Sequence, residues 1–209
     1  MRLIGIAAVV GVLSCPLAAV AAVELSVEAQ IAQAVSPLPE SLRAGAAVVT
    51  YDSSGTPKVL RQGTNAIVCQ PPQPAPAAQA AGTSGGSQTA APPEFSVSCY
   101  HKSMQPTRDF QAKLRAEGKT AKELTDAVAA ARKDGKLAAP AFGTMLYTRS
   151  GKSEAEARTL WVLLAPNATA ESTGLPTERP KEGGPWLMAA GTPGAHVMIP
   201  QTPAPAPTK

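Results

Sequence analysis

The chain has 209 residues, of which 44% are hydrophobic and 16% are charged, and its net charge at pH 7 is +4. This length allows one domain with a modest hydrophobic core. The positive charge is small and no arginine-rich stripe carries interleaved aromatic residues, so nucleic-acid binding is set aside.

Residues 1–22 have the layout of a secretory signal peptide. Arg2 gives a positive start, residues 3–23 carry no charge, and small residues at 19–22 suit signal peptidase. Two alternatives stay open. An uncleaved membrane anchor is one, because a segment of this length can just cross a bilayer. Lipidation of Cys15 is the other. Cleavage near residue 22 predicts a periplasmic or secreted protein without a membrane span.

Two cysteines, Cys69 and Cys99, remain after cleavage. They predict one disulfide, because an even number of cysteines in an exported chain is normally oxidised. Between them, residues 70–93 contain no charged residue and, apart from proline, no aliphatic side chain larger than alanine. Such a segment buries too little surface to offset its chain entropy, so a disordered insert is expected there. The proline-rich residues 201–209 predict a disordered tail.

Hydrophobic periodicity and turn residues define the remaining elements. Residues 23–43 predict a short helix or an extended arm, and residues 102–136 predict a helical hairpin with a capping box at Thr120. Strands are expected at residues 46–51, 58–61, 66–69, 95–100, 144–148, 159–164, 186–190 and 195–199. Together these elements predict a single α+β domain over residues 44–200. Its antiparallel sheet has about seven short strands, with the helical hairpin packed on one face.

The helical hairpin holds most of the excess positive charge. Residues 102–136 contain nine basic and five acidic residues, an excess about equal to the net charge of the whole chain. The ordinary interpretation is a solvated helix face. Contact with the envelope surface or with an acidic partner is the alternative. The sequence names no particular partner or cofactor.

Motifs that would indicate an enzyme are scarce. Gly151-Lys152-Ser153 resembles part of a phosphate-binding loop, but Leu146 stands where the loop needs its first glycine. No serine nucleophile elbow and no zinc-binding spacing is present. His101 and His196 are the two histidines, and both are candidate ligand-binding residues. A hydrolase would need one of them near a serine or a carboxylate, in a polar pocket beside the long loop at 166–185. A non-catalytic binding or envelope-associated module is therefore favoured, with a small periplasmic hydrolase as the enzymatic alternative.

The C-terminal segment predicts a hairpin whose loop parity decides its chemistry. An even loop pairs Met188 with Val197 and sends His196 and Met198 to the opposite face. An odd loop gathers Trp186, Met188, His196 and Met198 on one face, as in a soft-metal or haem-contacting site. The loop composition favours the even case, so a structural hairpin is expected. The alternative hypothesis is a metal or haem carrier, with copper bound by His196 and Met198.

Five segments resemble a group of exported bacterial proteins to which no activity is assigned. The resemblance covers most of residues 40–200 outside the insert and implies an exported, single-domain protein. It transfers no ligand and no catalytic residue. The segments are LRAGAAVV (42–49), LRQGTNAIVC (60–69), FSVSCYHKSM (95–104), ESTGLPT (171–177) and PWLMAAGTPGAHVMIP (185–200).

Overall fold

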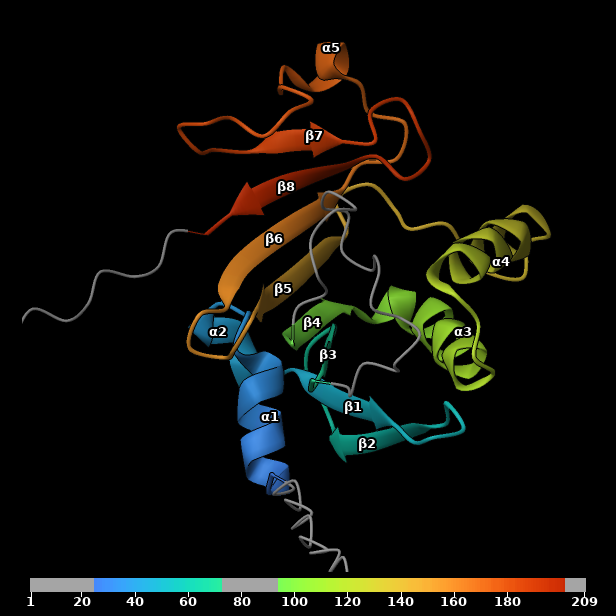
Figure 1. Ribbon diagram of the computed structural model, residues 1–209, viewed down its shortest axis with the longest axis vertical. Helices are drawn as coiled ribbons and strands as arrows, with labels where there is room; N and C mark the ends of the chain where they lie inside the picture. Colours follow the sequence, from blue (N-terminus) through green and yellow to red (C-terminus); the bar gives the residue numbers. More distant parts are fainter. Residues whose placement is uncertain (1–24, 73–93, 202–209) are drawn as a thin grey trace, which may run out of the picture.

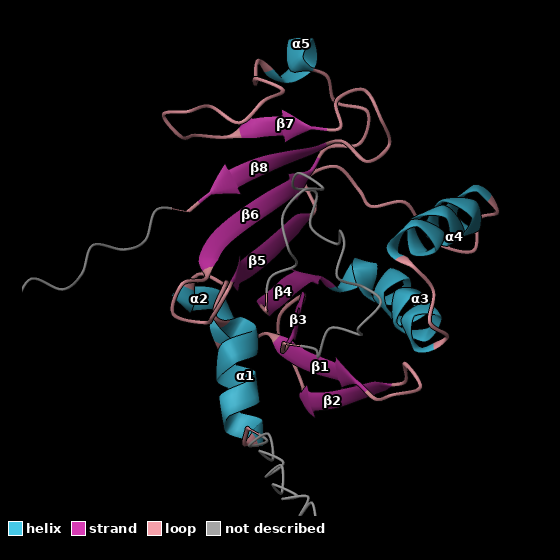
Figure 2. Ribbon diagram, viewed as in Figure 1, coloured by secondary structure: helices cyan, strands magenta, loops and turns pink. Residues whose placement is uncertain are grey.

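The computed structural model describes residues 25–72 and 94–201, which form one mixed β-sheet with helices on both faces (Figures 1 and 2). The predicted α+β class is confirmed. The expected signal peptide, most of the expected insert and all but the first residue of the expected tail lie outside the described residues. Within the described part, no helix has the length and apolar character needed to span a membrane.

The sheet has eight strands in the order β2-β1-β3-β4-β5-β6-β8-β7, from the bottom to the top of Figure 1. The strands are β1 (Ala47–Tyr51), β2 (Pro57–Arg61), β3 (Ile67–Gln70), β4 (Phe95–His101), β5 (Met145–Gly151), β6 (Arg158–Leu164), β7 (Trp186–Met188) and β8 (His196–Pro200). The helices are α1 (Val27–Val35), α2 (Glu40–Arg43), α3 (Gln105–Ala116), α4 (Ala121–Lys133) and α5 (Ala170–Thr173), with a 3-10 turn, η1 (Lys102–Met104), before α3.

The expectation of a purely antiparallel sheet is wrong, because β1 and β3 are parallel. Strand β2 folds back along the outer side of β1, and the chain then passes the start of β1 to enter β3 on its other side. The passage is held by the Gly45 carbonyl, which accepts hydrogen bonds from the backbone N–H of Thr64 and Asn65 at 2.8 and 2.9 Å. Gly63 has no space for a side chain there, since a Cβ would lie 2.5 Å from the Ala47 nitrogen.

Helix α1 covers one face of the sheet and buries the predicted disulfide. Cys69 and Cys99 lie directly opposite each other on β3 and β4, and the bond between them is present. Both are fully buried, together with Val48 and Ala34 of the same core cluster. Strand β3 extends to Gln70, so the first residue assigned to the insert belongs to the sheet.

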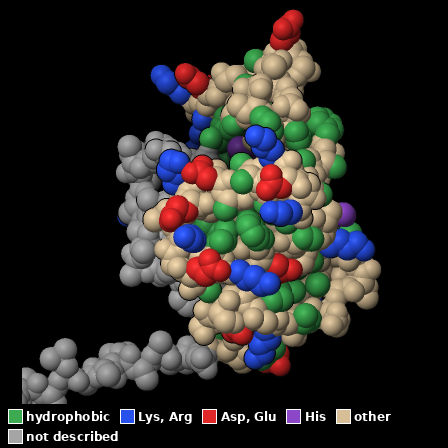
Figure 3. Space-filling model, turned by 90° about the vertical axis from the view of Figure 1, so that its right-hand side faces the viewer, with side chains coloured by type: hydrophobic (Ala, Val, Ile, Leu, Met, Phe, Trp, Pro, Cys, Tyr) green, Lys and Arg blue, Asp and Glu red, His purple; other side chains and the backbone are tan. Residues whose placement is uncertain are grey.

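The helical hairpin lies on the opposite face, as predicted. Helix α3 contacts the sheet, because Gln105 and Asp109 bond the hydroxyl group of Tyr51 on β1. Helix α4 packs against α3, with Phe110 against a cluster that contains Val128. Figure 3 shows the side of the molecule that carries this hairpin, where Lys and Arg alternate with Asp and Glu around hydrophobic side chains.

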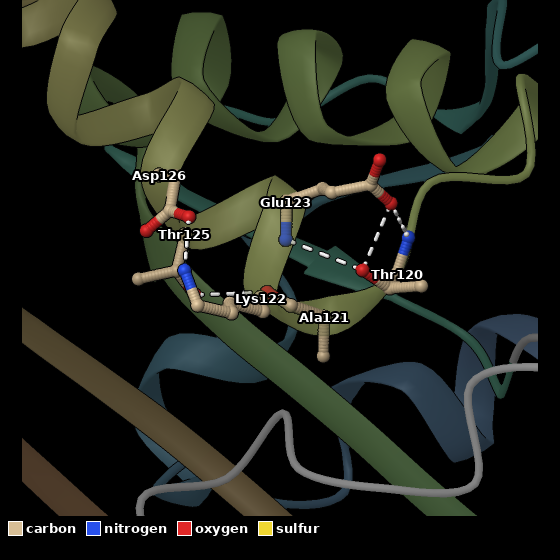
Figure 4. Close-up of polar contacts among 6 residues, drawn as sticks. All are labelled: Thr120, Ala121, Lys122, Glu123, Thr125 and Asp126. Atoms are coloured by element: carbon tan, nitrogen blue, oxygen red, sulfur yellow. Dashed lines mark hydrogen bonds and ion pairs between the residues drawn. The ribbon is translucent and has the colours of Figure 1, made fainter.

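The predicted capping box starts α4 (Figure 4). Thr120 Oγ1 accepts from the Glu123 backbone N–H at 3.3 Å, and Glu123 Oε2 accepts from the Thr120 backbone N–H at 2.8 Å. Each bond satisfies a donor that the first helical turn leaves without an intrahelical partner. Lys122, in the first turn, and Asp126, one turn later, form an exposed ion pair.

Thr120→Ala is expected to lower the free energy of unfolding by about 1 kcal/mol, because it removes the side-chain acceptor of this cap. Chemical denaturation measures the loss. Thr125→Ala is the control, since Thr125 lies one turn into the same helix and its hydroxyl only donates a hydrogen bond to the Ala121 carbonyl. An equal loss in the two variants would contradict a specific capping role.

Candidate soft-metal site on the C-terminal hairpin

The β7–β8 hairpin has the odd register, so the expected even loop is wrong. Trp186 pairs with Met198 and Met188 pairs with His196, with an odd number of loop residues between the strands. Residues that pair across antiparallel strands share a face. The structure therefore brings together the four candidate residues of this hairpin.

Hydrogen bonds to a neighbouring segment explain the longer loop. The backbone N–H of Gly191 donates to the Ala168 carbonyl at 2.7 Å, and the N–H of Asn167 donates to the Thr192 carbonyl at 2.8 Å. Ala189 adopts a left-handed conformation with φ 53° directly after β7. A tight four-residue turn would break these bonds, so tertiary contacts override the local turn preference.

The four side chains lie above an apolar part of the sheet. Val162 and Leu164 of β6 pair with Met198 and His196 and face the same side. Trp186 and Met198 are 8% and 6% exposed, whereas Met188 and His196 are half-buried. The hairpin thus offers two thioethers and one imidazole on a largely water-excluding surface.

The hydrogen bonding of His196 leaves one ring nitrogen available. Nδ1 lies 2.7 Å from the Gly194 carbonyl oxygen. A carbonyl only accepts, so in the neutral imidazole this contact places the proton on Nδ1 and the lone pair on Nε2. A backbone carbonyl on the other ring nitrogen is the usual partner that orients a metal-ligating histidine.

The long loop at 166–185 closes the outer edge of the site. The Leu187 N–H of the edge strand β7 donates to the Pro176 carbonyl at 2.8 Å. From the same loop, the Arg179 guanidinium lies 5.5 Å from the centre of the Trp186 ring. This indole face therefore already attracts one cation in the protein.

His101 does not join this group. His101 lies on the same face of the sheet as Cys99, whereas His196 lies on the opposite face, together with Tyr100. In addition, β4 and β8 are three strand positions apart, a total distance of about 14 Å. His101 is the N-terminal cap of η1: its Nδ1 accepts the Ser103 backbone N–H at 3.3 Å and lies 2.9 Å from Ser103 Oγ. A hydrolase needs a carboxylate to orient such an imidazole, and the described residues supply no hydrogen bond of that kind to His101.

Sequence reasoning missed a polar network between α3 and the sheet. Gln70 Nε2 and Gln105 Oε1 bond the Tyr100 hydroxyl at 2.9 and 3.0 Å, and Asp109 accepts from the Tyr51 hydroxyl at 2.8 Å. Burial is the main cause that raises the pKa of both tyrosines above their usual value. Both phenols are therefore neutral, and they tie β1, β3 and β4 to α3. No local spacing marks residues that come from four separate elements.

A groove on the described surface belongs to the helical hairpin. It has a volume of about 480 Å³ and is lined mainly by Phe110, Leu137 and alanines of α4, with Asp134 and Lys136 at its rim. Its two charged residues, Asp134 and Lys136, pair with each other at 3.4 Å, and the rest of its lining is apolar. Its open, apolar form carries no catalytic assignment.

Comparison of the chain with protein-family models, with curated proteins and with solved structures finds no match. The resemblance to exported bacterial proteins stays a prediction. The function is therefore argued from the site alone.

Proposed function

We propose that the protein is an exported, non-catalytic binding module that holds one soft monovalent cation, Cu(I), on the β7–β8 hairpin. The buried Cys69–Cys99 disulfide supports an oxidising compartment, and the described part has no membrane-spanning helix. The same module is proposed to belong to the exported bacterial group that its sequence resembles.

The observation that carries the metal assignment is the register that gathers Met188, His196 and Met198 on one face. Thioether sulfur selects Cu(I), and imidazole suits copper as well. The described residues contain no cluster of three or more His, Cys, Asp or Glu, so hard divalent ions find no comparable donor set there.

The same residues suit a haem less well than they suit a copper ion. Axial ligands of one haem iron stand on opposite sides of the porphyrin plane. His196 and Met198 project from the same face of one strand, two residues apart, and Met188 lies opposite His196 on that face. The three donors therefore lie on one side, which suits a small ion better than a haem.

The test is anaerobic titration of the mature protein with Cu(I) against a chromophoric chelator, with ascorbate as reductant so that the disulfide stays intact. We expect one equivalent to bind, with quenching of Trp186 fluorescence. Met188→Leu, Met198→Leu and His196→Ala each remove one donor and are expected to weaken binding by about tenfold or more. Met145→Leu on β5 is the matched control, because this methionine lies on the α1 side of the sheet.

Either of two results would overturn the assignment. One is the absence of stoichiometric Cu(I) binding by the oxidised protein. The other is a loss of affinity in Met145→Leu as large as that in Met188→Leu, which would show non-specific thioether binding.

A further inference from the structure

Two guanidinium groups lie on the sheet side of α3. The Arg108 guanidinium is 5.0 Å from the centre of the Tyr100 ring, which is fully buried. Arg115 follows two turns later, and Gln111 stands between them on the same helical stripe. Burial lowers the pKa of both arginines, and the positive charge of Arg108 lowers that of Arg115 further. The positive charge of Arg108 therefore acts on Arg115 along this stripe.

Neither arginine has an anionic partner among the described residues. The described ion pairs involve neither Arg108 nor Arg115, and Asp109, the carboxylate nearest along the helix, is bonded to Tyr51 and Gln105. Arg108 Nε and Gln111 Oε1 are buried without a hydrogen-bond partner. An unpaired charge and unsatisfied polar atoms in a half-buried place are costly unless a ligand completes them.

The exposed lysines of the same hairpin behave differently. Lys119 pairs with Glu123 and Lys122 pairs with Asp126 on side chains that are 45–85% exposed. Pairing is least needed at such exposed positions, because water solvates the charge. The hairpin thus pairs several charges that water can solvate, whereas no ion pair is formed by the half-buried Arg108 and Arg115.

We propose that Arg108, Gln111 and Arg115 form a binding site for the oxyanion group of a small molecule, a carboxylate or a phosphate. A guanidinium presents a fork of N–H donors that matches either group in bidentate fashion. The Tyr100 ring supports Arg108 from below, and the Tyr100 hydroxyl is already committed to Gln70 and Gln105. The Gln111 carboxamide can turn its amino group toward the same ligand.

This site is distinct from the proposed copper site. It lies on α3 over β4, whereas the copper site lies at the β7–β8 edge of the sheet. Binding of an oxyanion therefore does not depend on Cu(I), and the two proposals fail or succeed separately.

The experiment titrates the metal-free mature protein with phosphate and, separately, with succinate, at ionic strength held constant with sodium chloride. Calorimetry and thermal unfolding follow binding. We expect saturable binding of at least one of the two probes, and the stronger probe assigns the ligand as a phosphate or a carboxylate. Arg108→Gln is expected to weaken that binding by about tenfold or more, because it removes a charge-assisted bidentate contact.

Lys113→Gln is the matched control, since it removes one positive charge from the exposed side of the same helix. It should retain the affinity of the unsubstituted protein. Arg115→Gln provides an independent test if Arg108→Gln does not fold. Arg108→Gln should also leave the unfolding temperature of the ligand-free protein unchanged or raised, because an unpaired buried charge is lost.

Three outcomes would overturn the proposal. The first is the absence of saturable binding of either probe. The second is a loss of affinity in Lys113→Gln as large as that in Arg108→Gln, which would show general electrostatic attraction. The third is unchanged affinity of both arginine variants for the stronger probe.

Discussion

Replacing Cys69 or Cys99 by serine is expected to lower the free energy of unfolding by about 3–4 kcal/mol. The bond closes a loop with a sequence separation of 30 residues, and in the chain-entropy model a loop of this size accounts for that loss. For a domain of this size, the unfolding temperature should fall by about 10–15 °C. Calorimetry or circular dichroism of the oxidised protein measures the change.

The double variant Cys69→Ala/Cys99→Ala separates the covalent link from the sulfur atoms. It should lose about as much stability as either single variant, because each of the three lacks the same link. Reductant should destabilise the unsubstituted protein to a similar extent once it reaches the bond. Identical unfolding temperatures with and without the bond would contradict this account.

Gly55→Ala is expected to cost about 3 kcal/mol or more. Gly55 has a φ of 76°, and a Cβ there would lie 2.6 Å from both the carbonyl carbon and the oxygen of Ala112 on α3. The left-handed conformation costs about 1 kcal/mol with any side chain, and the overlap with helix backbone adds about 1–3 kcal/mol. Urea unfolding measures the loss, together with any weakening of the contact between α3 and the β1–β2 turn.

Gly118→Ala isolates the conformational part of this effect. Gly118 joins α3 to α4 with a φ of 78°, and nothing lies within 4 Å of a Cβ at that position. The variant should lose only about 1 kcal/mol. If the two glycine variants lost equal stability, the close approach of α3 to Gly55 would not stabilise the fold.

Local patterns predicted the elements well. The capping box at Thr120 and the alternation along residues 95–100 depend on neighbours a few residues apart, and both elements are present. The parallel pairing of β1 with β3 was not predictable in this way. It depends on whether the chain, after β2, forms its next strand beside β2 or on the other side of β1. The close packing of Gly63 against Ala47 lets the chain pass to the other side.

The candidate site was predictable only as two alternatives. Side-chain alternation established that Trp186 and Met188 share a face, but the partner face depends on loop parity. Bonds from Gly191 and Thr192 to the distant segment 165–168 decide that parity, and no hairpin rule contains them. The proposed oxyanion site was harder still to predict, because Arg108 and Arg115 are ordinary in sequence, and only the structure shows that they are half-buried without a described anionic partner.

The parallel pair also divides the sheet into the β1–β2 hairpin on one side and the six strands from β3 to β7 in the sheet order on the other. We expect this joint to resist force less well than the joint between β3 and β4. Strands β1 and β3 pair at only two positions, Ala47 with Val68 and Val48 with Cys69. Strands β3 and β4 are in addition linked covalently by the disulfide. A force or fluctuation that opens the sheet should therefore separate β1 and β2 first, as one hairpin. The Tyr51 hydroxyl of β1 is bonded to Asp109 and Gln105 of α3. We therefore expect α3 to hold the β1–β2 hairpin to the rest of the domain from outside the sheet.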